Sequence, residues 1–372
     1  MKSKNTKLGI KIMNRTLIAF SFLSLLVTSE SFASNSDLNS AFKKHYKAYQ
    51  SAVKSGDKES IIKSAKQAYE IGQQFYGEHD INTINLAINY ANALDNKNPD
   101  KLALLESNLK IIETHHKDNL KTTFDVTLPI AKITFDENSR AALNSLKEIA
   151  QKAEEQKDYE FASVAYHEAI KLAVRKSKTV PVARKLIRRN DEINKAHLPE
   201  ISVQRLTSDM WVASLDEARN RKKAAINRLE HVVKVFDQNL DFDHPFELTA
   251  HSKLVGLYEK SGQSDKATKH CLAIAEMVPW KDNQEQEPLY RAHPEYPSNM
   301  ARRMKSGWVK LQFTISKSGF VKDIEVMDSS EEGFEKASVE ALEQWRYAPK
   351  FENGEPVEAV STVQLDYKIS RG

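Results

Sequence analysis

The sequence predicts an α+β multidomain protein, in which a long all-α helical array is followed by a small α+β domain. Three observations support this fold class. Residues 38–280 show helical periodicity nearly throughout, interrupted by short polar breaks. The polar stretch 281–287 then separates Pro279 from Pro288. Beyond that stretch the apolar residues recur at every second position, which is typical of strands.

The first 33 residues have the three parts of a secretory signal peptide. Residues 2–15 are basic, residues 16–27 are apolar, and Ser31-Phe32-Ala33 places small residues at the two positions that a signal peptidase reads. We therefore expect an exported protein, cleaved after residue 33. The apolar run is shorter than the roughly 20 residues that span a bilayer. An uncleaved inner-membrane anchor over residues 16–29 is the alternative.

The charge of the chain lies in this N-terminal segment. The 372 residues hold 55 basic and 51 acidic side chains, a formal charge of +4. The same excess occurs within residues 1–33, where five basic residues face a single acid, Glu30. The remainder is therefore formally neutral, which argues against a nucleic-acid partner.

Four polar breaks in the helical region join helix-length patterns, as expected for stacked hairpins. The breaks are Ser55-Gly56-Asp57, Asp95 to Asp100, Gln156-Lys157-Asp158 and Ser261-Gly262-Gln263. Two segments, 114–137 and 178–210, fit this pattern poorly. Within the first, the β-branched stretch 122–130 is compatible with a loop or with an irregular helix start.

The most regular hairpin resembles the tetratricopeptide repeat (TPR). Its apolar and small residues stand at the family spacings: Leu254, Leu257, Tyr258, Gly262, Ala267 and Pro279. A second unit contains Ala162, Tyr166 and Ala169, and weaker ones cover 41–75 and 81–113. His79 and His244-Pro245 are similar to loop residues in the variant repeats of kinesin light chains. Such a solenoid implies a concave surface for a protein partner.

The C-terminal residues predict the order helix, strand, strand, helix, strand. Val309, Leu311, Phe313 and Ile315 alternate with polar residues, and a turn at Lys317-Ser318-Gly319 leads to a second strand through Val321, Ile324 and Val326. Phe334, Ala337, Ala341, Leu342 and Trp345 form an apolar helical stripe, Asn353-Gly354 is a turn, and Val363, Leu365, Tyr367 and Ile369 alternate in a last strand. We expect a three-stranded antiparallel sheet with two helices, folding independently over residues 288–372.

These residues resemble the C-terminal domain of TonB, the envelope energy transducer of Gram-negative bacteria. The matching motifs occur in order over residues 288–370: Arg291-Ala292-His293-Pro294-Glu295-Tyr296-Pro297, Gly307 to Phe313, Gly319-Phe320-Val321, Asp328-Ser329-Ser330, Trp345-Arg346-Tyr347-Ala348-Pro349 and Asn353 to Val357. Each motif is short, but their common order and spacing are specific.

The resemblance implies a periplasmic protein that binds the TonB box, an extended peptide of TonB-dependent outer-membrane receptors, by adding it as a strand to a sheet edge. The implied contacts are Arg291, His293, Pro294, Tyr296 and Pro297, together with the last strand at Ser361, Thr362, Val363, Gln364, Leu365, Asp366 and Tyr367. His293 replaces a residue that is Gln in the best-studied member of the family.

Two departures from the family keep a second function open. A full transducer has an uncleaved membrane helix with a His that engages inner-membrane motor proteins, and residues 16–29 contain no His. A transducer also has a Pro-rich spacer, where this chain has helical repeats. The chain is therefore either a TonB-family transport protein or a periplasmic TPR scaffold whose TonB-like module binds protein or cell wall without coupling to the proton gradient.

An enzyme is the least supported class. The sequence lacks HExxH, Walker A, GxSxG and paired-Cys metal motifs, so we expect no cofactor and no catalytic or metal site. Cys271 is the single cysteine, which excludes an internal disulfide, and its apolar neighbours predict a small core residue.

Overall fold

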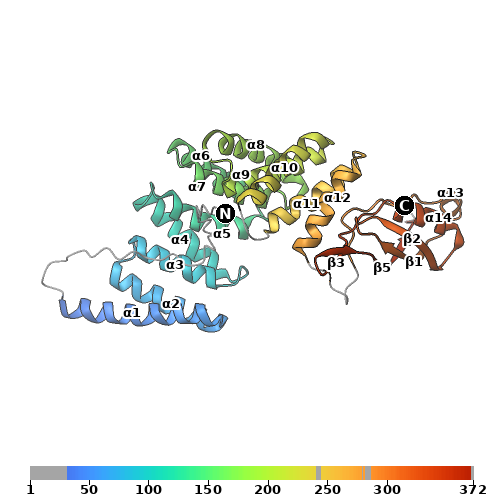
Figure 1. The fold of residues 1–372 in the computed structure, drawn as a ribbon. Helices are drawn as coiled ribbons and strands as arrows, with labels where there is room; N and C mark the ends of the chain where they lie inside the picture. Colours follow the sequence, from blue (N-terminus) through green and yellow to red (C-terminus); the bar gives the residue numbers. More distant parts are fainter. Residues whose placement is uncertain (1–31, 240–243, 279, 281–285, 370–372) are drawn as a thin grey trace. The chain divides into compact units, whose positions relative to one another are not determined.

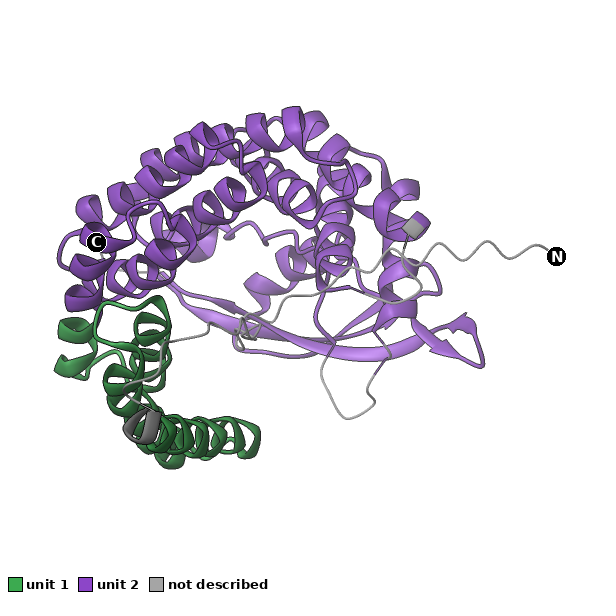
Figure 2. Cartoon of the chain, turned by 90° about the vertical axis from the view of Figure 1, so that its left-hand side faces the viewer, with its two compact units in different colours: residues 1–104 green, residues 105–372 purple. Residues whose placement is uncertain are grey.

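The computed structural model describes residues 32–239, 244–278, 280 and 286–369 (Figure 1). Residues 1–31, which hold most of the predicted signal peptide 1–33, lie outside the described residues. The chain forms two compact units, residues 1–104 and 105–372, with the division inside one helix (Figure 2). Among the described helices, none is both long enough and apolar enough to cross a bilayer.

The first unit is a set of antiparallel helices. It comprises α1 (Phe32–Ser55), α2 (Lys58–Tyr76), α3 (Ile81–Ala93) and the start of α4 (Pro99–His115). The predicted turn at Gly56 joins α1 to α2, with a left-handed φ of 73°. At Gly72 a side chain would collide with Leu86, because an added Cβ would stand 2.3 Å from the Leu86 Cδ1 atom. A glycine at this point lets α2 and α3 approach closely.

The helices of the second unit follow one another as neighbours, in an outer and an inner row (Figure 2). They are α5 (Leu120–Thr134), α6 (Ser139–Glu155), α7 (Tyr159–Ala173), η1 (Ser177–Thr179), α8 (Val180–His197), α9 (Val203–Ala218), α10 (Lys222–Asn239), α11 (Pro245–Glu259) and α12 (Ser264–Met277). Each helix from α5 to α12 contacts the next, which confirms the expected fold of stacked helical hairpins.

The polar breaks that the sequence singled out are helix boundaries. At the α6–α7 turn, Lys157 has a φ of 61° and the Asp158 carboxylate accepts a hydrogen bond from the Phe161 amide at 3.2 Å. At the α11–α12 turn, Gly262 has a φ of 69°. The cap and the left-handed residues end one helix and start the next within three residues at the first turn and four at the second.

The segments that fitted the repeat pattern poorly are also helical. The β-branched stretch 122–130 lies in α5, which contains Pro129 and begins where the Asn119 side chain accepts a bond from the Thr122 amide at 3.1 Å. The segment 178–210 forms the end of η1, α8 and the first half of α9. Packing of apolar faces against neighbouring helices outweighs the weaker helix propensity of these residues.

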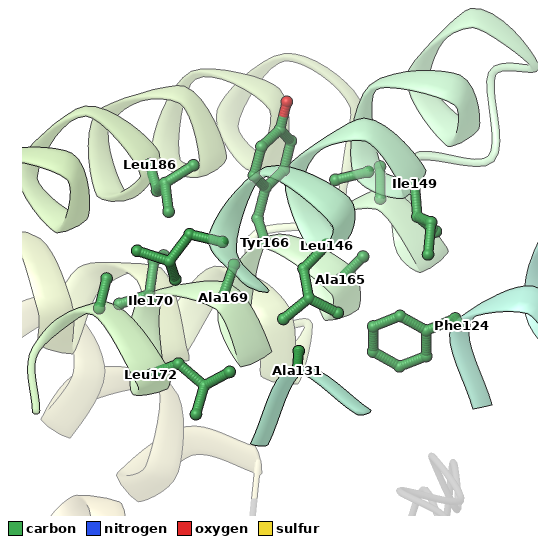
Figure 3. Packing of buried hydrophobic residues seen from close by; sticks show 14 of the residues in the cluster. Phe124, Ala131, Leu146, Ile149, Ala165, Tyr166, Ala169, Ile170, Leu172 and Leu186 are labelled. Atoms are coloured by element: carbon green, nitrogen blue, oxygen red, sulfur yellow. The ribbon is translucent and has the colours of Figure 1, made fainter. Parts of the chain in front are cut away.

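Small and large residues alternate in the helical core. Ala162, Ala165 and Ala169 of α7 are fully buried and let neighbouring helices approach, while Tyr166 fills the space between them (Figure 3). The Tyr166 hydroxyl donates to Glu154 of α6. Ala162, Tyr166 and Ala169 are the residues that the sequence assigned to a repeat.

A buried ion-pair network links α8, α9 and α10. Arg228 of α10 donates to both oxygens of Asp191 on α8, at 2.8 and 2.9 Å, and to Asp209 on α9. Lys195 reaches Asp191 at 3.0 Å and His231 reaches Asp209 at 2.8 Å. Three helices thus share one set of charges, which specifies their mutual position.

The C-terminal domain contains the predicted three-stranded antiparallel sheet. Its elements are α13 (Ser298–Arg302), β1 (Gly307–Ile315), β2 (Val321–Ser329), η2 (Glu332–Phe334), α14 (Glu335–Leu342), β3 (Lys350–Glu352), β4 (Glu355–Val357) and β5 (Ala359–Tyr367). The strand order is β2-β1-β5, and β3 pairs with β4 in a separate hairpin. The core holds the alternating residues Val309, Leu311, Phe313 and Ile315 of β1 with Phe334, Leu342, Trp345 and Tyr347.

Both predicted turns of this domain have residues in the left-handed region. Gly319 has a φ of 79°, and a Cβ there would stand 2.2 Å from the Tyr347 carbonyl oxygen. Asn353 and Gly354 have φ values of 52° and 81°, the pattern of a type I′ hairpin turn.

The predicted apolar stripe of the second helix is partly wrong. The helix α14 ends at Leu342, so Trp345 lies beyond it, and Ser338 rather than Ala337 is its fully buried residue at the middle of the helix. The Ser338 hydroxyl lies 2.8 Å from the Tyr367 hydroxyl and so has a polar partner in the core.

Candidate functional site

The strand β5 forms one edge of the three-stranded sheet. Its nine residues pair with β1 in an uninterrupted register, from Gly307↔Tyr367 to Ile315↔Ala359. Within the described part of the chain, no strand pairs with its other side. A long, regular edge of this kind presents unpaired backbone groups to an added strand.

The direction of the β5 backbone groups follows from Trp308 of β1. The Trp308 amide donates to the Ser330 hydroxyl at 2.7 Å, and its carbonyl accepts from the Ser330 amide at 2.9 Å, so both groups point toward β2. Its partner on the other side, Asp366, therefore stands in a non-hydrogen-bonded pair. The Asp366 amide and carbonyl must point away from β1, toward the open edge.

Because the register has no bulge, this direction repeats at every second residue of β5. Val360, Thr362, Gln364 and Asp366 direct their backbone groups to the open edge, and all four side chains are exposed. Ser361, Val363, Leu365 and Tyr367 direct theirs to β1, and Leu365 and Tyr367 have buried side chains that belong to the domain core.

The opposite edge, β2, is less regular. Its pairing with β1 contains two register shifts, and Asp323 has a positive φ of 50°. Charged residues lie along β2, and the Lys322 ammonium nitrogen lies 2.9 Å from a carboxylate oxygen of Glu358. Bulges and charges are features that discourage strand addition, so β5 is the better template.

The segment 291–297 runs along the core of the same domain. The exposed Arg291 places its guanidinium carbon 5.2 Å from the centre of the Trp345 ring, and the Trp345 indole donates to the Ala292 carbonyl at 2.8 Å. His293 is exposed, and Pro294 is half-buried. The Pro297 carbonyl accepts the Met300 and Ala301 amides at the start of α13.

Tyr296 is the residue of this segment that meets β5. Its ring lies edge-on to those of Phe334 and Tyr367, with centroids 5.7 and 5.6 Å apart, and its hydroxyl donates to the Lys305 carbonyl. The structure thus joins the two groups of predicted site residues through Tyr296 and Tyr367. Arg291 lies instead against Trp345, and His293 is exposed.

A group of titratable side chains lies elsewhere, between α10 and α11. Ligand atoms of Asp237, Glu247 and His251 come within 4.8 Å of one another, so this group has the chemistry to hold a cation. The His251 ring nitrogen Nδ1 lies 2.8 Å from that of His270. Burial and the neighbouring His270 lower the pKa of His251 to about 4, so its imidazole is neutral at pH 7.

The sequence did not assign a role to the buried Arg346, and the predicted edge 360–369 included Val360 without naming it as a contact. Val360 is 65% exposed, and its backbone groups face the open edge. The alternation along the strand is the sequence feature that could have identified it. Arg346 is 1% exposed and reaches Glu259 of α11, 87 residues away in sequence. Cys271 is fully buried, as predicted for a core residue, and burial raises the pKa of its thiol to about 12.

The fold defines a two-part protein, in which an array of helical hairpins precedes a small antiparallel α+β domain with an open strand edge. Residues 292–369 match the family of the Gram-negative bacterial TonB protein C-terminal domain. The chain therefore carries a TonB C-terminal domain behind an array of stacked helical hairpins.

The similar proteins match the two parts separately. Protein TonB of Pseudomonas aeruginosa is 31% identical over 86 residues, which are 23% of this chain, and the chain spans 25% of the length of that relative. The solution structure of the Pseudomonas aeruginosa TonB C-terminal domain is 29% identical and covers 24% of this chain and 93% of its own, with a TM-score of 0.22. A kinesin light chain of Podosopora anserina with nearly identical TPR-like repeats is 16% identical and covers 65% of this chain and 95% of its own, with a TM-score of 0.26.

Proposed function

We propose that this chain is a periplasmic TonB-family protein that binds the TonB box of outer-membrane receptors by strand addition at β5 and supports energy-dependent transport. The observation that carries the proposal is the regular open edge of β5, in a domain that matches the TonB C-terminal domain. In this proposal the peptide pairs with the backbone of Val360, Thr362, Gln364 and Asp366.

The side chains beside this edge supply the rest of the contact. Val360 offers an exposed apolar group at one end of β5, and Gln364 donates to Asp366 at 2.9 Å at the other. The segment Arg291, His293, Pro294, Tyr296 and Pro297 would contact the part of the peptide that extends past Tyr367.

Proline substitutions along β5 test strand addition, because proline lacks the amide hydrogen. Thr362→Pro and Gln364→Pro remove a donor at the open edge and leave the ladder to β1 intact. Each should weaken binding of a TonB-box peptide about tenfold or more, measured by fluorescence anisotropy, with an unchanged circular dichroism spectrum. Val363→Pro removes a donor to β1 and should instead destabilise the domain.

Matched controls separate the effect of losing the backbone amide hydrogen from the effect of changing the side chain. Thr362→Val and Gln364→Ala keep the N–H group, so peptide affinity should stay within about threefold of the wild type. If folded Thr362→Pro and Gln364→Pro proteins bind the peptide as the wild type does, the β5 edge is not the binding site. The Tyr296-Pro297 region would then be tested next.

A second candidate is a periplasmic TPR scaffold that uses the same module without coupling to the proton gradient. It is favoured by the helical array that precedes the TonB C-terminal domain. The two candidates differ at the N-terminus of the mature protein. Sequencing of the purified protein should give Met1 for an anchored transducer, which would contact inner-membrane motor proteins, and Ser34 for the scaffold. Pull-down with residues 38–280 tests whether the helical array binds a further protein by itself.

A further inference from the structure

Arg346 is a buried cation between the helical array and the C-terminal domain. Its side chain is 1% exposed, and its guanidinium donates to the Glu259 carboxylate of α11 and to the Thr268 hydroxyl of α12, the latter at 2.7 Å. It also donates to the Ser318 carbonyl of its own domain at 2.9 Å, and stands 3.6 Å from the centre of the Phe320 ring. A charge buried this deeply is stable only with such partners, so they must stay together.

Apolar and backbone contacts surround this ion pair. Leu289, Tyr290 and Ala348 pack against the core of the helices that include α11 and α12. The Arg346 amide donates to the Tyr290 carbonyl at 3.0 Å, and the Leu289 amide donates to the Arg346 carbonyl at 2.7 Å. A Cβ on Gly319 would lie 3.4 Å from the Cβ of Cys271, so the backbone of the β1–β2 turn lies directly against α12.

A helical array requires a cover at its last hairpin, because each hairpin buries its apolar face against the next. After α12 no further hairpin follows among the described residues. Cys271 of α12 is fully buried, and the β1–β2 turn of the C-terminal domain covers it on the side of Gly319. We propose that the C-terminal domain is the cap of the helical array, held there by the buried Arg346–Glu259 ion pair, so that α11, α12 and the domain move as one body.

This interface leaves the proposed peptide-binding edge open. The contacts that form it come from Leu289, Tyr290, the β1–β2 turn, residues 346–348 and β3. In the described part of the chain, none of them involves an edge-facing residue of β5. The domain is therefore a fixed extension of the helical array and not a module on a flexible tether. This inference is independent of whether β5 binds a receptor peptide.

Cys271 is a natural reporter of the docked state, since it is the one cysteine of the chain and lies under the interface. In the full-length protein its thiol should react slowly with 5,5′-dithiobis(2-nitrobenzoic acid) (DTNB). Glu259→Gln and Arg346→Gln each remove one charge and leave the other buried and unpaired. Each should raise the labelling rate at least about tenfold, while the circular dichroism spectrum stays unchanged.

Matched variants distinguish undocking from loss of fold. Glu343→Gln and Arg302→Ala change exposed charges of the same domain and should label at the wild-type rate. Thr268→Val acts from the helical side, cannot disturb the C-terminal domain itself, and should also accelerate labelling. The double variant Glu259→Gln/Arg346→Gln should label no faster than the faster single variant, because the two groups act as a pair.

The proposal fails if wild-type Cys271 reacts as fast as in the urea-unfolded chain. It also fails if folded Glu259→Gln and Thr268→Val proteins both label at the wild-type rate. A loss of tryptophan fluorescence and circular dichroism signal in the Arg346 variant alone would identify a folding defect of that variant, and the two helical-side variants would then decide the question.

Discussion

The ring of Tyr296 lies edge-on against the ring of Tyr367, with centroids 5.6 Å apart. Tyr367 also stacks on Phe334 at 4.4 Å, and the Tyr296 hydroxyl donates to the Lys305 carbonyl. The segment that leads into the C-terminal domain is thereby attached to the last residue of the edge strand. Edge-to-face aromatic contacts of this kind contribute about 0.5–1.5 kcal/mol beyond the buried area.

Removing the Tyr296 ring should detach the two segments. Tyr296→Ala should lower the free energy of unfolding by about 2–4 kcal/mol in urea denaturation, because the half-buried ring has aromatic partners on two sides. Tyr296→Phe keeps the ring and loses only the hydroxyl bond, so its loss should be about 1 kcal/mol. Equal losses for the two variants would mean that the ring contacts contribute nothing.

Trp345 should be a major determinant of the stability of the C-terminal domain. Its side chain is 2% exposed, and its indole N–H has a backbone partner in Ala292. Trp345→Ala should therefore cost about 3–5 kcal/mol of unfolding free energy, measured by circular dichroism in urea. The half-buried Trp308 is the control, and Trp308→Ala should cost less. A loss below about 1 kcal/mol for Trp345→Ala would contradict its place in the core.

Arg228 should be essential to the packing of α8, α9 and α10. Arg228→Met leaves the carboxylates of Asp191 and Asp209 buried without their shared partner, which should cost about 3–5 kcal/mol. Arg188→Met on the exposed face of α8 is the control and should change stability by less than about 0.5 kcal/mol. A thermal unfolding midpoint for Arg228→Met as high as that of Arg188→Met would argue against the network.

The buried His251 predicts a pH-dependent stability. Burial, followed by the neighbouring His270, lowers the pKa of His251 to about 4 in the folded protein. As the pH falls, His251 therefore binds a proton in the unfolded chain before it does so in the folded chain. The contribution of neutral His251 to the free energy of unfolding is fully present above pH 6.5, the ordinary pKa of histidine. It is lost as the pH falls from 6.5 to about 4. The loss should amount to roughly 1–3 kcal/mol.

A neutral variant isolates this effect from the titration of carboxylates. The unfolding free energy of His251→Gln should depend less on pH between 4 and 6.5 than that of the wild type. His79→Gln, at an exposed position, should keep the wild-type profile. Parallel profiles for wild type and His251→Gln would show that His251 does not titrate differently in the folded protein.

Much of the fold was accessible from local patterns in the sequence. The helical period, the left-handed turn residues Gly56, Gly262 and Gly319, and the alternation along β1 each depend on neighbours within a few residues. Exceptions arose where packing outweighed local preference. The β-branched stretch of α5 is helical around Pro129, and Trp345 lies beyond α14 although it continues the stripe.

The sequence by itself determined the two kinds of structure, their order along the chain and the motifs of the TonB C-terminal domain. The helical period of 3.6 residues and the strand period of 2 can be recognised from residues that are close together in the chain. The tertiary structure decided which amides of β5 point to the open edge, because that depends on hydrogen bonds of Trp308 with Ser330 on the far side of β1. It also decided that Arg346 is buried against Glu259, since a charge finds such a partner only after residues 87 positions apart have been brought together.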